Sequence, residues 1–445
     1  MLVPRHWTVR LRAAHWSLSV ALSATPVFAQ ATNPKVAVAP APDASAPAAP
    51  APTDVPAVAP VAIPATEPSP EPATQAPAEA PSAAPTALPG LPPPAPAEAP
   101  APRAAVGDDE HWYDSFVLRA FADSYFSLNY NTPKPQSSGN GVIRAFDTSN
   151  GFAVAWAGLD ISHPAEPIGG TISLRFGPSA QRYNASCAGK CDADYGLQNV
   201  KQAFASFRPG GKGSPITLDF GKFDTIYGAE VADSQDNLNY TRGELYYNFQ
   251  PFWHTGIRMA YEVGGFVGRV IVANDANKSN LGRGAINAGL QVGYSNDYFG
   301  VVAGALQSLK PDTTVANGGF IDTFIDVVAT VNAGDFSLVG NFDLNVGYEA
   351  GDFWGASLAA GYSFVPAFGI ALRGEYLAFT GDADLWTGTL TFDVKPIPDV
   401  ENVVVRWDNR IEVANTEAFL NTAGDDTTKV WFGTVLGLVA YADLL

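Results

Sequence analysis

The sequence predicts an all-β protein: a transmembrane antiparallel β-barrel of about 16 strands (range about 14–18), preceded by a disordered Ala/Pro-rich segment. Three features of its 445 residues lead to this fold class. Apolar and polar side chains alternate with a period of two over most of the chain, and an export signal stands at the N-terminus. In addition, no amphipathic helical pattern is long enough to cover the apolar face of a sheet.

The alternation is clearest at residues 253–263. To the end of the chain, one face of each predicted strand stays apolar and the other stays polar or small. A β-strand sends successive side chains to opposite faces. One face here carries Trp253, Ile257, Met259, Tyr261 and Val263, and the other carries His254, Gly256, Arg258, Ala260 and Glu262. A soluble half-buried strand can have the same pattern, but an apolar face that recurs in every strand needs a covering layer. Lipid provides that layer when the sheet closes into a barrel without a free edge.

Residues 1–29 are predicted to be a secretory signal peptide. Arg5, Arg10 and Arg12 form a basic start, an apolar stretch follows up to Phe28, and small residues precede a cleavage site after Ala29. The apolar stretch is short and interrupted by serine and proline, which favours cleavage over a retained anchor. Together with a barrel, this signal indicates the outer membrane of a Gram-negative-type envelope.

Residues 30–106 consist almost entirely of alanine and proline, and we expect them to be disordered. Where it is extended as polyproline II, such a chain rises about 3.1 Å per residue and could reach on the order of 200 Å. Two interpretations are open: a periplasmic spacer that reaches the cell wall, or a leader without a further role.

Residues 107–445 have one uniform pattern and are predicted to be a single outer-membrane barrel domain. A membrane-crossing strand needs about 9–11 residues, and connections bring the repeat to about 20 residues per strand. Long loops are expected at 177–198 and 228–239, and 240–249 is expected to be a strand that pairs with 253–263. The uncharged stretch 353–372 is long enough for a membrane helix, but its period of two favours two strands with a turn near Pro366.

The formal net charge of −18 argues against nucleic acid as a partner, because binding to phosphates needs clustered lysine and arginine. In a pore, the same charge predicts a weak preference for cations. It can equally reflect acidic external loops that only hydrate the protein. Acidic runs such as 233–236 and 424–426 match no defined calcium-binding loop, and no metal or cofactor is expected.

Cys187 and Cys191 lie in the loop-like sequence Cys-Ala-Gly-Lys-Cys. An exported compartment permits disulfides, and the intervening glycine allows so small a loop to close. Since no histidine lies nearby in the sequence, a local disulfide is favoured over a metal site.

The sequence does not predict an enzyme. Nucleophilic catalysis by serine needs a nearby base, usually histidine. Beyond the signal peptide the histidines are His111, His163 and His254, and no Gly-x-Ser-x-Gly motif is present. His254 begins a predicted strand and is expected to be an interfacial side chain near an aromatic girdle.

The charged residues of the predicted strands fall on the polar face, because facing lipid would cost each about 2–4 kcal/mol near the membrane centre. We therefore predict that these residues line the lumen: Arg119, Asp123, Arg175, Asp219, Arg242, Glu244, Arg258, Glu262, Asp343, Glu349, Arg373, Glu375, Arg406, Asp408, Arg410 and Glu412. Opposite charges recur two residues apart, on one face. They can neutralise each other along the wall or set up a transverse field that orders polar solutes. Asp343 and Glu349, on a strand without a basic residue, are the best candidates for attracting cations.

Three stretches together resemble the OmpL-like β-barrel porin family. They are FADSYFSLNYNTP at 121–133, DFGKFDTIYGAE at 219–230, and NYTRG at 239–243 leading into PFWHTG at 251–256. The resemblance extends over most of 112–445, and its motifs place strands and turns without naming a solute. It implies an outer-membrane channel of broad specificity.

The expected function is therefore a porin-like channel for passive diffusion of small polar solutes or ions, with a weak preference for cations. The alternative is a structural envelope barrel that anchors the Ala/Pro-rich tether and has no significant conductance. A transporter of hydrophobic substrates would need an apolar lumen, which the charged inner face disfavours. The expected partners are outer-membrane lipid, the diffusing solutes and, through the linker, the cell wall; oligomerisation is left open.

Overall fold

The computed structural model describes residues 115–132, 150–185, 196–279, 286–309, 323–347, 352–380, 383–396, 402–421 and 427–443. The predicted signal peptide, the Ala/Pro-rich segment, His111, Glu349 and both cysteines lie outside these ranges. Their roles, including the disulfide between Cys187 and Cys191, therefore stay predictions. Among the described helices, none is long and apolar enough to cross a membrane.

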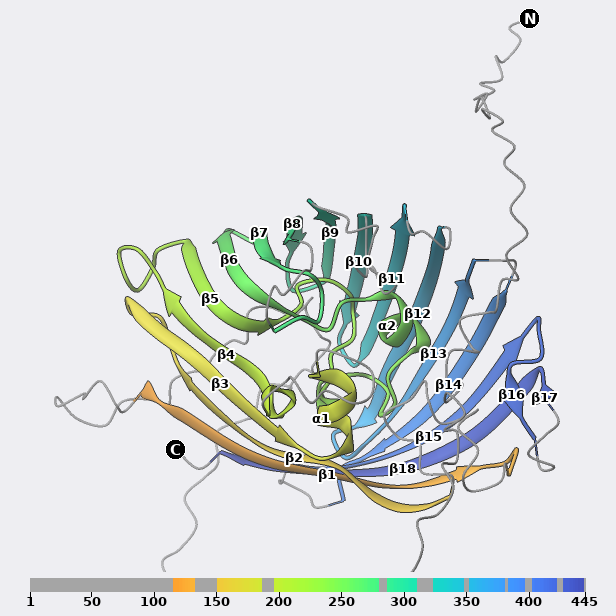
Figure 1. The fold of residues 1–445 in the computed structure, drawn as a ribbon. Coiled ribbons are helices and arrows are strands. Elements are labelled where there is room, and N and C mark those ends of the chain that lie inside the picture. The colour runs from red at the N-terminus through yellow and green to blue at the C-terminus, as the bar shows by residue number, and fades with distance from the viewer. Residues whose placement is uncertain are drawn as a thin grey trace, which may run out of the picture. The chain divides into compact units, whose positions relative to one another are not determined.

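Sixteen strands close into an antiparallel barrel (Figure 1). They are β1 (Val117–Asn129), β2 (Gly151–His163), β3 (Ile168–Phe176), β4 (Val200–Phe207), β5 (Ile216–Asp224), β6 (Trp253–Val263), β7 (Phe266–Asn274), β8 (Ile286–Ser295), β9 (Phe299–Ser308), β10 (Thr323–Ala333), β11 (Phe336–Val346), β12 (Phe353–Val365), β13 (Phe368–Ala378), β14 (Asp384–Val394), β15 (Val403–Ala414) and β18 (Val430–Asp443). The short strands β16 (Phe419–Leu420) and β17 (Thr427–Thr428) pair separately. The helical elements are α1 (Pro178–Tyr183), α2 (Glu244–Phe249) and the 3₁₀ turns η3 (Leu197–Asn199) and η4 (Ser234–Asp236).

The barrel closes because β1 pairs with β2 on one side and with β18 on the other. Arg119, for example, lies opposite Asp160 of β2 and opposite Asp443 of β18. No edge of the main sheet is left open, as a sheet surrounded by lipid requires. The all-β fold class and the expected number of about 16 strands are confirmed.

The two faces of the strands follow the alternation in the sequence. On β6, Ile257 and Tyr261 are exposed on the outer surface, whereas Arg258 and Ala260 are buried. Trp253 departs from the pattern, because it is buried and its Nε1 donates to the main-chain oxygen of Tyr183 at 3.0 Å. The stretch 353–372 also follows the period of two: it forms β12 and the start of β13, with the turn at 366–367.

Aromatic side chains gather at both ends of the outer surface, where a membrane barrel meets the lipid headgroups. At one end the Trp354 and Tyr376 rings lie 5.2 Å apart, and those of Tyr376 and Trp386 lie 4.4 Å apart. At the other end, Phe364 stacks on Phe368 at 5.8 Å across the β12–β13 turn. The apolar band between these rings is the part that faces hydrocarbon.

We expect Leu372→Arg to destabilise the barrel by about 2–4 kcal/mol, since Leu372 lies exposed in the middle of β13. The matched change Val365→Arg, at the turn end of β12, should cost only about 0–1 kcal/mol. Reversible urea unfolding of protein folded into lipid vesicles measures both. Equal losses at the two positions would contradict the assignment of the outer surface to lipid.

The connections at the two ends of the barrel differ in length. Residues 264–265, 334–335 and 366–367 make short turns at one end, as expected of outer-membrane barrels. At the other end the connections are longer, and the one between β5 and β6, residues 225–252, is described throughout. This connection folds into the barrel instead of outward.

Candidate functional site: a segment folded into the barrel

Residues 225–252, here called the inner segment, lie within the ring of strands and contact the wall on widely separated strands (Figure 1). Tyr227 donates to the main-chain oxygen of Ala305 on β9 at 2.8 Å. Glu230 pairs with Arg373 on β13, and Ser234 bonds Asp123 on β1 at 2.7 Å. The segment therefore crosses the barrel interior instead of lining one side of it.

The prediction of a strand at 240–249 is wrong, because residues 244–249 form the helix α2 inside the barrel. A helix of six residues is too short to persist alone. The first N–H groups of a helix have no carbonyl acceptor within the helix. Here the wall provides the acceptor: Glu375 accepts hydrogen bonds from Glu244 N at 3.2 Å and from Leu245 N at 3.0 Å. The wall thus supplies the cap that the helix sequence lacks, and Arg242 and Glu244 belong to the inner segment.

Glycines on the inner wall receive the large side chains of the inner segment. Tyr227 lies against Gly289 of β8 and Gly304 of β9, where any added Cβ would overlap its ring or hydroxyl. Tyr240 occupies the corresponding position against Gly437 of β18. Packing this close leaves no room for a side chain on the wall.

Further contacts of the same kind fix α2. Leu245 and Phe249 lie against Gly355 of β12, where an added Cβ would come within 2.6 Å and 2.9 Å of them. Both residues are buried together with Leu377 and Leu385 of the wall. The lumen beside α2 is therefore apolar in part, which the charged strand pattern did not indicate.

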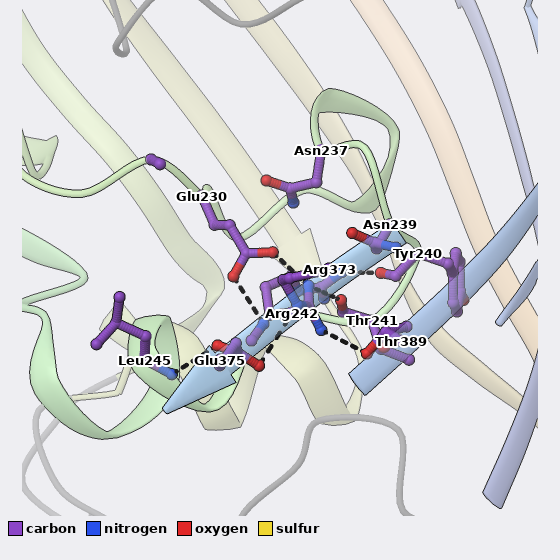
Figure 2. Close-up of polar contacts among 12 residues, drawn as sticks. Glu230, Asn237, Asn239, Tyr240, Thr241, Arg242, Leu245, Arg373, Glu375 and Thr389 are labelled. Atoms are coloured by element: carbon purple, nitrogen blue, oxygen red, sulfur yellow. Dashed lines mark hydrogen bonds and ion pairs between the residues drawn. The ribbon is translucent and has the colours of Figure 1, made fainter. Parts of the chain in front are cut away.

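The first polar anchor is on β13 (Figure 2). Arg373 binds Glu230 at 2.5 Å and donates to the main-chain oxygen of Thr241 at 2.8 Å. Glu375, whose side chain is fully buried, holds the start of α2 and accepts from Thr387 at 2.5 Å. These two side chains bind the middle of the inner segment from one strand.

The second polar anchor is on β15. Arg406 donates to the main-chain oxygens of Ser234 at 2.6 Å and Asn237 at 2.7 Å. Asp408 accepts from Thr241 N at 2.7 Å, while Arg410 pairs with Glu244 at 2.7 Å. Charged side chains at every second position of one strand therefore hold the segment along its length.

The third polar anchor lies across the barrel, on β1, β3 and β4. Asp123 accepts hydrogen bonds from Ser234 and from the Tyr240 hydroxyl. Asp233 binds Arg175 at 3.2 Å and Lys201 at 2.6 Å. Burial alone would raise the pKa of Asp233, but the two cations together hold it well below its usual value. The carboxylate is therefore ionised and stays paired.

Helix α1 supports the inner segment from one side. Arg242 donates to the Tyr183 hydroxyl at 3.2 Å, and the Tyr183 ring lies 5.9 Å from that of Tyr246 and 5.5 Å from that of Phe252. Lys222 of β5 donates to the main-chain oxygen of Asn184, just after α1, at 2.9 Å. Part of the β3–β4 connection thus packs with the inner segment as one unit.

The candidate residues from the sequence fall into distinct groups. Eleven are buried on wall strands: Asp123, Arg175, Asp219, Arg258, Asp343, Arg373, Glu375, Arg406, Asp408, Arg410 and Glu412. Arg119 pairs with Asp443 at the end of the barrel, and Glu262 is about half exposed and pairs with Arg269. Most of these residues hold the inner segment or pair with each other, and few face open water.

The structure adds a contact at one predicted residue and corrects the expectation for another. Asp343 is buried as an inward residue should be, but Gln250 of the inner segment covers it with a hydrogen bond of 2.7 Å. His254 is fully buried and bonds Thr225 at 3.2 Å, so the prediction of an interfacial side chain is wrong. In both cases the sequence pattern does not reveal what covers the inner wall.

Other charged residues were missed by the sequence reasoning. Asp160, Arg269 and Asp393 stand at polar positions of predicted strands, so the alternation could have found them. Glu230 and Asp233 lie in what is a loop by sequence, and nothing local indicates their partners on β13, β3 and β4.

Solved structures of barrels are similar to this chain at low identity. OmpT of Vibrio cholerae is 13% identical, with a TM-score of 0.47, and the match covers 76% of this chain and 99% of that one. An anion-selective porin from Comamonas acidovorans is 15% identical, with a TM-score of 0.49 and coverage of 74% and 99%. Salmonella typhi OmpF in complex with daunomycin is 14% identical, with a TM-score of 0.49 and coverage of 74% and 97%. These likenesses carry no argument about function.

The family comparison is more specific. Residues 115–439 match the model of the family described as "Putative beta-barrel porin-2, OmpL-like". A comparison with curated proteins gave no match. Because the family match spans most of the chain and the strands close into the expected barrel, the chain belongs to the OmpL-like family of outer-membrane β-barrel porins.

Proposed function

We propose that this porin-family barrel passes small polar solutes or ions by passive diffusion around the inner segment, with a weak preference for cations. The observation that carries the preference is an asymmetry in exposure within the ion pairs of the barrel interior. In several pairs the basic side chain is buried while the carboxylate keeps contact with solvent. A solute on the remaining aqueous path therefore meets acidic groups more often than basic ones.

Three pairs on the side of the short turns carry this asymmetry. The side chain of Asp160 is 27% exposed against 2% for Arg175, that of Glu262 49% against 4% for Arg269, and that of Asp393 22% against 9% for Arg406. In two pairs nearer the inner segment the acidic side chain is also more exposed than the basic one: Asp224 with Lys201, and Glu230 with Arg373. In the pair of Arg119 and Asp443 both side chains are exposed, so this pair adds no preference for cations or anions.

The preference should be weak, because each acid remains close to a buried cation. A free carboxylate 4 Å from a monovalent ion in water attracts it by about 1 kcal/mol, a factor of about five in local concentration. Its paired arginine cancels part of that field, and salt screens the rest within about 10 Å at 0.1 M.

Neutralising Asp160 and Asp393 together by Asn substitution is expected to move the reversal potential toward anions. The local cation concentration should fall by less than the factor of about five that an unpaired carboxylate would give. Bilayer recordings in a salt gradient at low ionic strength measure this shift. Glu417→Gln, in the β15–β18 connection, is a matched control that removes one charge away from these pairs and should leave the potential unchanged. An anion-selective wild-type channel would contradict the proposal.

A structural envelope barrel without significant conductance is the second candidate. The observation in its favour is that the inner segment buries most of the charged inner wall, including Asp343, Glu375 and Asp408. If packing of this kind closes the water path, the barrel serves as an anchor in the membrane. Conductance of the purified wild-type protein separates the two functions.

A further inference from the structure

We propose that Asp326 of β10 and Asp343 of β11 hold one proton between them, and that this proton locks both ends of the inner segment onto the barrel wall. Its loss at alkaline pH would leave two adjacent carboxylates, admit water between them and loosen the segment. The proposal goes beyond diffusion through the barrel, since it assigns a pH-sensitive contact to a pair of residues that a channel does not itself require.

The two carboxyl groups face each other directly. Asp326 and Asp343 are partners in the β10–β11 register, and both side chains are completely buried. Asn341 Nδ2 bridges them, donating to Asp326 Oδ1 at 2.9 Å and to Asp343 Oδ1 at 3.2 Å, while the buried Oδ2 of Asp326 has no hydrogen-bond partner among the described residues. An ionised carboxylate only accepts hydrogen bonds, whereas a proton on this oxygen would make it a donor toward the facing Asp343 carboxyl.

No cation compensates the pair among the described residues. Ion pairs with arginine or lysine hold several of the other buried acids, such as Asp219 with Arg258 and Asp233 with Lys201, whereas no ion pair of Asp326 or Asp343 is formed among the described residues. No basic residue is among the principal groups that act on either carboxyl. Two buried like charges without a partner are unfavourable, and sharing one proton removes one of them.

Neighbouring strands bring no charge to this position. Gly304 of β9 stands opposite Asp326 in the ladder, and Gly355 of β12 stands opposite Asp343. From the inner segment, the titratable group that faces the pair is the Tyr227 phenol. Burial, and next the Asp326 carboxyl, raise the pKa of Tyr227 above its usual value, so this phenol stays neutral and supplies no counter-charge.

The inner segment is tied to this pair at both of its ends. Asn341 of β11 donates to Asp326 at 2.9 Å and to Asp343 at 3.2 Å, and its own oxygen accepts from Ala229 N at 3.0 Å. Gln250 donates to the same Asn341 oxygen and to Asp343, at 2.7 Å each. Ala229 lies near the start of the segment and Gln250 near its end, so one cluster on the wall fixes both.

The shared proton can be observed directly. An infrared difference spectrum of the folded protein at neutral pH should contain the C=O stretch of a protonated carboxyl group, and this band should be lost in Asp326→Asn and in Asp343→Asn. Each variant keeps one carboxylate, without a like charge beside it. Asp335→Asn, in the exposed turn of the same β10–β11 hairpin, is the matched control and should keep the band.

The lock itself is tested by amide hydrogen exchange of residues 227–231 and 244–250. After correction for the intrinsic pH dependence of exchange, protection of these peptides should fall with rising pH in the wild type and stay constant in Asp326→Asn.

Absence of the infrared band from the wild type, or its persistence in both variants, would overturn the shared proton. Equal pH dependence in wild type and Asp326→Asn would overturn the lock. Neither readout requires the barrel to conduct, so both are independent of the proposed channel function.

Discussion

Replacing residues 226–251 by an Asn-Gly turn is expected to raise single-channel conductance and to shift ion selectivity toward anions. The barrel can close without this segment, because Asp224 is paired with Trp253 and Thr225 N donates to the Phe252 oxygen at 3.1 Å. A two-residue turn of this type joins adjacent antiparallel strands well. With the segment gone, the space that it fills between the strands becomes available to water and ions.

The shift toward anions follows from the charges that the deletion removes and those that it leaves. Residues 226–251 contain four acidic side chains and one arginine. Their removal leaves Arg373, Arg406 and Arg410 of the wall without their bonds to the segment. Bilayer recordings of both proteins, after heat-modifiable gel migration has confirmed folding, measure the two effects. An unchanged conductance would show that the segment does not limit the pore.

Glu375→Leu should lower the free energy of local opening of the inner segment by about 3–5 kcal/mol, which is the cost of removing one partner of a buried ion pair. It would leave Arg373 without one of its carboxylates and the first N–H groups of α2 without their acceptor. Amide exchange at Leu245 and its neighbours, converted to a free energy of local opening, measures the loss.

Glu262→Leu is the control for this prediction. Glu262 also pairs with an arginine of the wall, but it is half exposed, and such pairs contribute only about 0–1 kcal/mol. The barrel strands should remain protected in both variants. Similar losses at Glu262 and Glu375 would mean that the buried anchor on β13 does not hold the segment.

The strands could be predicted from the sequence because each one carries its own signal. In β6 and β11 the apolar face is set by contact with lipid, which acts on each strand independently. The turn near Pro366 could be predicted for the same reason, since it interrupts a pattern that is visible on both sides.

The inner segment could not be predicted, because its conformation depends on contacts distant in the sequence. Residues 240–249 are rich in tyrosine and phenylalanine and read as a strand, yet α2 forms where Glu375, more than a hundred residues later, accepts its first N–H groups. One signal was available: Gly289, Gly304 and Gly437 stand on the inner wall, where a polar lumen would favour larger side chains. Glycine there indicates close approach of another part of the chain.

The most direct test of the central claim is the single-channel conductance and reversal potential of the purified full-length wild-type protein in a salt gradient. A path around the inner segment that meets more acidic than basic groups predicts a small but measurable conductance, below that of the protein with residues 226–251 replaced, and a cation preference that fades as ionic strength rises. A folded wild-type barrel without conductance, beside a conducting deletion protein, would contradict this account and would identify the inner segment as a closed plug.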